Sequence, residues 1–128
     1  MKILVADDEK EVVDILKEYL EEKGLSADVA FDGKETLNLI KTNNYDIAFI
    51  DENMPELSGL EIVEFIKQNN LNVKTVILTG YPAIDESISR AVGADEFLEK
   101  PVNLDQIAKI IEKFRKKQKE EENGGTEC

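Results

Sequence analysis

Several polar side chains follow apolar runs of this sequence, and their chemical types together suit phosphoryl transfer. They are two adjacent acids, Asp7 and Asp8, a third acid, Asp51, a hydroxyl, Thr79, and an ammonium, Lys100. Three carboxylates held close together raise one another's pKa values, and a hard divalent cation such as Mg²⁺ relieves their repulsion. An ammonium and a hydroxyl can bind phosphoryl oxygens, and a carboxylate nucleophile gives an aspartyl phosphate. The set predicts a phosphoryl acceptor if the fold brings it together.

Each member taken singly has an ordinary explanation. The pair Asp7-Asp8 could cap a helix, Thr79 could belong to a strand-end turn, and Lys100 could be solvated. The prediction therefore depends on whether all of them stand at matching strand ends.

The elements that would position these residues alternate between strand and helix. The predicted strands are residues 2–6, 27–31, 47–50, 73–79 and 97–98. Three predicted helices begin with residue pairs that are typical of helix caps, namely Asp32 with Glu35, Ser58 with Glu61, and Asn103 with Gln106. The expected inward faces of the five helices are Val12, Ile15, Leu16, Tyr19 and Leu20; Leu37 and Ile40; Leu60, Val63 and Ile66; Ile84, Ile88, Ala91 and Val92; and Leu104, Ile107, Ala108, Ile111 and Phe114.

Strict alternation of this kind predicts an α/β fold, a doubly wound (βα)5 unit with a five-stranded parallel sheet and helices on both faces. In the strand order 2-1-3-4-5 the first, third and fourth strands are neighbours, and ligands bind at the carboxyl ends of such strands. Asp7, Asp8 and Asp51 then share one crevice with Thr79. Asp32 follows the edge strand, so we expect it to be a helix cap only.

Composition excludes several classes of protein. The 128 residues carry a formal charge of −12, and such an acidic body repels phosphate backbones, which argues against nucleic-acid binding. No apolar run reaches the length of a membrane span, so no membrane partner is expected. The one cysteine, Cys128, allows no internal disulfide, and we expect a cytoplasmic protein. The chain has no histidine, so any phosphohistidine must come from a partner.

The chain resembles a response-regulator receiver domain of two-component signalling, with the architecture of single-domain chemotaxis-type receivers. The resemblance covers about residues 1–114 and is carried by Asp7-Asp8, Asp51-x-x-Met54-Pro55-x-x-x-Gly59, Thr79-Gly80 and Lys100-Pro101. It implies a flavodoxin-like fold and a phosphorelay switch that uses Mg²⁺, with Mn²⁺ as a substitute. It also implies slow self-dephosphorylation rather than enzymatic turnover of small substrates.

The resemblance implies a role for each matching residue at the metal site. Asp51 matches the phosphoacceptor and a metal ligand, Asp8 matches the direct Mg²⁺ ligand, and Asp7 matches the acid that acts largely through water. Asn53 would offer its backbone carbonyl to the metal.

The resemblance further implies a switch and two partners. Thr79 and Lys100 match the pair that binds the phosphoryl group, and Phe97 falls at the aromatic switch position, although a core aromatic is an equal alternative. The donor would be a histidine kinase or a histidine phosphotransfer protein. An unknown downstream protein would read the face formed by the fourth helix, the fifth strand and the last helix.

Two other functions stay open at this point. A phosphohydrolase similar to haloacid dehalogenases would need an acid two residues after Asp51, and Asn53 cannot supply the proton. A non-phosphorylated adaptor on the same fold would not need the complete polar set. We expect the receiver domain to span residues 1–118 and a flexible polar tail to span residues 119–128. The unit either stands alone or belongs to a longer regulator with an output domain.

Overall fold

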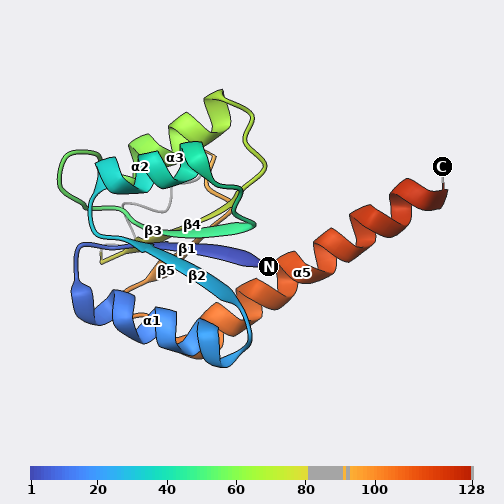
Figure 1. The fold of residues 1–128 in the computed structure, drawn as a ribbon, viewed down its shortest axis with the longest axis horizontal. Helices are drawn as coiled ribbons and strands as arrows, with labels where there is room; N and C mark the ends of the chain where they lie inside the picture. The colour runs from blue at the N-terminus through green and yellow to red at the C-terminus, as the bar shows by residue number, and fades with distance from the viewer. Residues whose placement is uncertain (81–90, 92, 128) are drawn as a thin grey trace.

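The computed structural model describes residues 1–80, 91 and 93–127, with side chains up to residue 118, and shows one parallel sheet in the order β2-β1-β3-β4-β5 (Figure 1). The strands are β1 (Lys2–Ala6), β2 (Ser26–Ala30), β3 (Ile47–Asp51), β4 (Lys74–Thr79) and β5 (Glu96–Glu99). The described helices are α1 (Lys10–Glu22), α2 (Gly33–Thr42), α3 (Gly59–Gln68) and α5 (Leu104–Glu127). The predicted fold and strand order are confirmed. The predicted helix around Ile84 and Ile88 lies outside the described residues.

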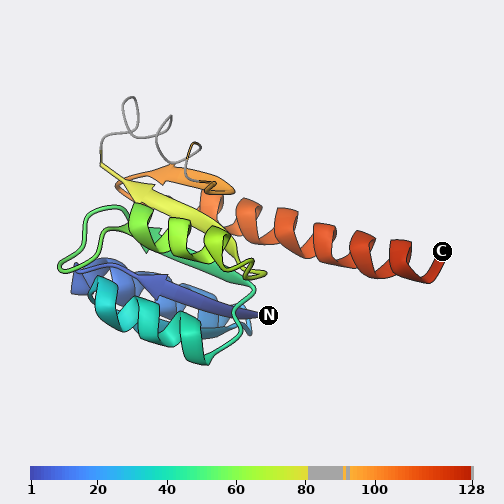
Figure 2. The same cartoon turned by 90° about the horizontal axis from the view of Figure 1, so that it is seen from above.

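Helices cover both faces of the sheet, with α1 and α5 on one face and α2 and α3 on the other (Figures 1 and 2). Because successive side chains of a strand point to opposite faces, Ile3 and Val5 pack with α1 and α5, while Leu4 and Ala6 pack toward α2 and α3. Burial on both faces explains why the central strands are continuously apolar.

Helix α1 presents a different inward face from the predicted one. Val13, Leu16 and Leu20 are buried, whereas Ile15 is 56% exposed. The prediction that Ile15 points inward was therefore wrong. The apolar arc of α1 is wider than its contact with the sheet, so a periodicity of 3.6 residues allows two overlapping stripes, and the stripe with Val13 is the one that packs.

The predicted helix caps are confirmed. A side-chain oxygen of Asp32 accepts from the backbone N–H of Glu35 at 2.7 Å, and Ser58 Oγ accepts from that of Glu61 at 3.2 Å. In the same way Asn103 Oδ1 accepts from the Gln106 N–H at 3.3 Å. These bonds satisfy amide groups that would otherwise lack partners at the start of each helix.

Helix α5 continues to Glu127 and projects away from the sheet (Figures 1 and 2). The boundary predicted at residue 118 therefore does not coincide with a helix end, because residues 115–122 are mostly Lys, Gln and Glu, which favour helix. The flexibility of residues 119–128 stays a prediction. None of the described helices combines the length and the apolar character that crossing a membrane requires.

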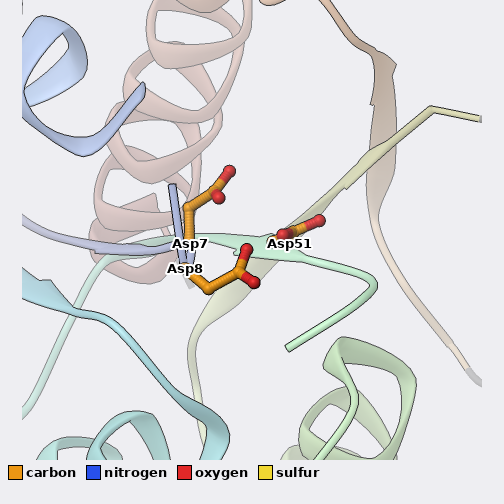
Figure 3. A group of neighbouring side chains, drawn as sticks. All are labelled: Asp7, Asp8 and Asp51. Atoms are coloured by element: carbon orange, nitrogen blue, oxygen red, sulfur yellow. The ribbon is translucent and has the colours of Figure 1, made fainter. Parts of the chain in front are cut away.

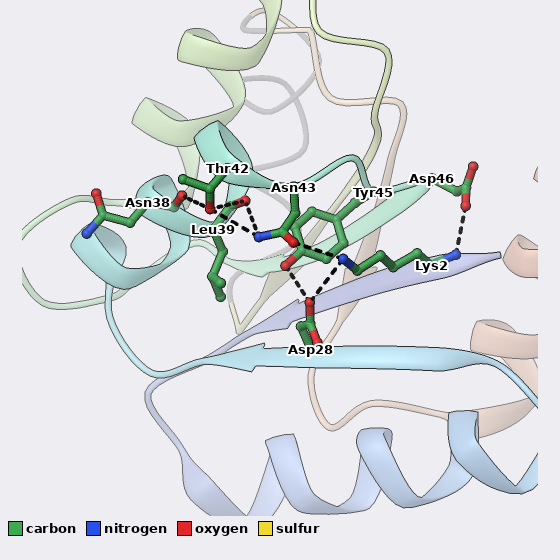
Figure 4. A network of polar contacts seen from close by, with 8 residues as sticks. All are labelled: Lys2, Asp28, Asn38, Leu39, Thr42, Asn43, Tyr45 and Asp46. Carbon is green, nitrogen blue, oxygen red and sulfur yellow. Dashed lines mark hydrogen bonds and ion pairs between the residues drawn. The ribbon is translucent and has the colours of Figure 1, made fainter.

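A polar network lies near the amino-terminal edge of the sheet, away from the predicted site (Figure 4). The buried Tyr45 hydroxyl donates to Asp28 at 2.7 Å, and Lys2 Nζ donates to Asn43 Oδ1 at 2.9 Å. Burial and the Asp28 carboxylate raise the pKa of Tyr45 far above its usual range. The backbone N–H of Lys2 donates to Asp46 at 2.7 Å, so the network ties the start of β1 to the segment before β3.

Candidate functional site

Three carboxylates meet at the carboxyl edge of the sheet (Figure 3). Asp7 and Asp8 follow β1, Asp51 ends β3, and one oxygen of each lies within 4.8 Å of the others. These strands are neighbours, and Ala6 is paired with Ile50, so Asp7 and Asp51 occupy equivalent positions along them. Asp7 is fully buried and Asp51 is 5% exposed, whereas Asp8 faces solvent. The prediction that these three acids lie close together is therefore confirmed.

Lys100 places its ammonium among these acids. Its Nζ lies 2.9 Å from Asp7 Oδ2 and 3.4 Å from Asp51 Oδ1, and a third contact, to Glu9 Oε1, is 2.9 Å long. The backbone N–H of Lys100 donates to the Thr79 carbonyl at 2.7 Å, which fixes the end of β5 against β4. The ammonium is therefore held between the two most buried carboxylates of the site.

The electrostatics of the site favour a bound cation. Burial raises the pKa of Asp51, the charge of Asp7 raises it further, and Lys100 partly opposes both effects, leaving the pKa at about 7. Burial lowers the pKa of Lys100, but its hydrogen bonds with Asp7 and Glu9 and the nearby charge of Asp51 outweigh burial and raise the pKa overall. One ammonium thus faces several carboxylates, and the negative charge of the site is incompletely balanced.

The loop after Asp51 is clamped by backbone contacts. The Glu52 N–H donates to the Leu78 carbonyl at 3.0 Å, and the Gly59 N–H donates to the Glu52 carbonyl at 2.9 Å. A Cβ atom at Gly59 would lie 2.3 Å from the Asp51 carbonyl oxygen, so only glycine allows α3 to begin this close to β3. The Asn53 N–H donates to Asp51 Oδ1 at 3.3 Å, which orients that carboxylate.

The two predicted switch residues lie on β4 and β5. Thr79 is 1% exposed, and its hydroxyl donates to Glu52 Oε2 at 2.7 Å. Phe97 is half-buried and packs against the core on the α2 and α3 side, so its packing agrees with a core aromatic, and its switching role stays a prediction. A cleft of about 490 Å³ opens beside the acids, lined in part by Asp8, Asp51, Asn53, Gly80 and Lys100.

The sequence-based prediction assigned no contact to two acids of the site. Glu9 pairs with Lys100, and the run of three consecutive acids at Asp7, Asp8 and Glu9 was an available signal. Glu52 contacts the Thr79 hydroxyl, and its only sequence signal is its place directly after Asp51. Neither contact could be foreseen from spacing, because each depends on side-chain rotamers and loop geometry.

The donor set fits a hard divalent cation. All three clustered groups are carboxylates, which Mg²⁺ prefers over nitrogen or sulfur ligands. Asp7 Oδ2 is buried and lies 2.9 Å from the Lys100 ammonium, which balances part of the negative charge of the cluster. One ammonium does not balance three carboxylates, and a divalent cation would offset the remaining negative charge.

The family model for the response regulator receiver domain matches residues 3–112. The chain belongs to this family. The receiver is the phosphoacceptor switch of two-component response regulators. Among curated relatives, the transcriptional regulatory protein DltR of Streptococcus agalactiae is 32% identical over 108 residues, which are 84% of this chain and 48% of DltR. The chain thus spans about half the length of these curated relatives.

Solved receivers share the fold. The response regulator TrrA of Thermotoga maritima, in complex with Mg²⁺ and BeF, is 35% identical with a TM-score of 0.80, and the match covers 88% of this chain and 97% of TrrA. The receiver domain of Ssk1 from Saccharomyces cerevisiae, crystallised with the histidine phosphotransfer protein Ypd1, is 29% identical with a TM-score of 0.80. That match covers 87% of this receiver and 86% of the Ssk1 chain.

Proposed function

We propose that Asp51 of this receiver accepts a phosphoryl group from the phosphohistidine of a histidine kinase or a histidine phosphotransfer protein. The observation that carries the proposal is the environment of Asp51, which ends a central strand, is 5% exposed, and lies beside Lys100 Nζ at 3.4 Å. A buried carboxylate with a neighbouring ammonium and a cleft open to a donor is suited to nucleophilic attack on phosphorus.

The proposed transfer is balanced in bonds and protons. An Asp51 carboxylate oxygen forms a bond to phosphorus, the bond from phosphorus to the donor imidazole nitrogen breaks, and the imidazole takes up a proton from solvent. Lys100 and the Thr79 hydroxyl bind oxygens of the transferred group. Asp7, Asp8 and Asp51 would hold Mg²⁺ together with the Asn53 carbonyl, and the cation supplies neutralisation of phosphoryl charge. Mn²⁺, which also takes oxygen ligands, would serve in its place.

The remaining parts of the proposal concern the cell. The donor histidine comes from a partner, because this sequence contains none. The phosphorylated receiver acts by shifting a conformational equilibrium toward a state that a downstream protein reads on a face that includes β5 and α5, with Thr79 and Phe97 as switch residues. We propose a cytoplasmic location and no turnover of small phosphate esters beyond slow loss of the phosphoryl group.

The test is labelling by a small-molecule phosphodonor such as acetyl phosphate in the presence of Mg²⁺, followed by mass spectrometry of the intact protein. The parent should gain one phosphoryl group, and Asp51→Asn should gain none. Asp14→Asn, which makes the same chemical change on the exposed side of α1, should label as the parent does. Equal labelling of Asp51→Asn and the parent would overturn the proposal.

A further inference from the structure

We infer that the Glu52 carboxylate competes with the phosphoryl group for the Thr79 hydroxyl, and so sets how readily the phosphorylated state forms. This inference rests on the proposed function of Asp51. It assigns a role to an acid that follows the acceptor directly and that no metal or phosphoryl contact explains.

The geometry that carries the inference is a hydrogen bond across two strands. Thr79 Oγ1 donates to Glu52 Oε2 at 2.7 Å, at the carboxyl ends of β4 and β3. The backbone of Glu52 is held in place, because its N–H donates to the Leu78 carbonyl and its carbonyl accepts from the Gly59 N–H. Glu52 also lines the cleft beside Asp51 and Lys100. Glu52 therefore contacts both the Thr79 hydroxyl and the cleft in which a transferred phosphoryl group would lie.

The competition follows from the chemistry of a hydroxyl. Thr79 has one hydroxyl proton, so it can donate fully either to Glu52 or to a phosphoryl oxygen. Both acceptors are anionic, and a hydrogen bond to a charged acceptor is stronger than one to a neutral group. When Thr79 turns to the phosphoryl group, Glu52 must give up this bond. The negative charge of Glu52 also repels the phosphoryl group. Both the hydrogen bond and this repulsion therefore favour the unphosphorylated arrangement.

The size of the effect can be stated as a ratio of affinities. Loss of one charge-assisted hydrogen bond at a buried donor corresponds to roughly a tenfold change in an equilibrium constant, or somewhat more. Removing the Glu52 carboxylate should therefore strengthen binding of a phosphoryl mimic by roughly tenfold, provided that the Thr79 hydroxyl is present.

The experiment is a double-mutant cycle in which the affinity for a phosphoryl mimic, beryllofluoride with Mg²⁺, is measured for each variant. Binding is monitored through changes of amide resonances in NMR spectra. Glu52→Ala should bind the mimic roughly tenfold more tightly than the parent does. In a Thr79→Val background, the same Glu52 change should produce a much smaller effect. Glu56→Gln is the matched control, because it removes an exposed negative charge from the same loop without lining the cleft, and it should leave affinity nearly unchanged.

A second readout needs neither metal nor mimic. In the metal-free protein, Glu52→Ala and the milder Glu52→Gln should shift the Thr79 methyl resonance, and Glu56→Gln should not. If Glu52→Ala does not fold, Glu52→Gln carries the same comparison. The inference is overturned if the Glu52 variants bind the mimic with the same affinity as the parent. It is also overturned if the Glu52 change raises the affinity equally with and without the Thr79 hydroxyl, which would show an effect of charge alone. Failure of the parent itself to bind the mimic would instead contradict the proposed function.

Discussion

Replacing Asp51, the proposed acceptor, by asparagine should stabilise the metal-free protein. Burial and the charge of Asp7 raise the pKa of Asp51 from its ordinary value of 3.8 to about 7. A raised pKa means that the folded state binds the proton more tightly than the unfolded state, so stability falls as pH rises between these two values. The full difference corresponds to about 4 kcal/mol above pH 7. Asp51→Asn removes this cost and keeps the shape of the side chain.

The assay is urea unfolding of Asp51→Asn and the parent in the presence of a chelator, at about pH 8 and about pH 5. We expect the variant to be more stable by about 2–4 kcal/mol at the higher pH, with a gain that is smaller by about 2 kcal/mol at the lower pH. Asp14→Asn, on the exposed side of α1, should change stability by less than about 0.5 kcal/mol. A gain that is absent, or that is equal at the two pH values, would refute the electrostatic description of the site.

Three further predictions concern the metal, the loop after Asp51 and the polar network around Tyr45. Mg²⁺ at about one hundred times its dissociation constant should stabilise the parent by about 2.7 kcal/mol in urea unfolding. Asp8→Ala should lose most of this stabilisation. If Mg²⁺ stabilised Asp8→Ala as much as the parent, the assignment of Asp8 as a ligand would be contradicted. Gly59→Ala, whose Cβ would meet the Asp51 carbonyl at 2.3 Å, should cost about 2 kcal/mol or more, whereas Gly80→Ala, with nothing within 4 Å, should cost much less. Tyr45→Phe should cost about 1 kcal/mol by thermal or urea unfolding, because its buried hydroxyl bond is lost; no loss would show that this bond contributes nothing.

The fold was predictable because the alternation of apolar strands with amphipathic helices is compatible with few sheet topologies. The capping pairs, such as Asp32 with Glu35, marked the helix starts. The inward face of α1 was only partly predictable, since Ile15 and Val13 both fit a helical stripe, and contact with the sheet decided between them. Helix α5 extends beyond residue 118 because the Lys, Gln and Glu residues near that position favour helix, and a flexible tail over residues 119–128 stays a prediction.

The site was predictable as a set of strand ends but not as a network of contacts. The strand order places Asp7 next to Asp51, and that juxtaposition follows from the pattern alone. The contacts of Glu9 with Lys100 and of Glu52 with Thr79 depend on rotamers and on loop geometry, which spacing does not encode.

The most direct test of the central claim is phosphoryl transfer from a histidine. A histidine phosphotransfer protein labelled with radioactive phosphate would be mixed with this receiver and Mg²⁺, and the label on each protein followed with time. Label should move to the parent receiver and should be released by hydroxylamine, as an acyl phosphate is, while Asp51→Asn should take up none. Transfer of label to Asp51→Asn, or label on the parent that resists hydroxylamine, would contradict Asp51 as the acceptor.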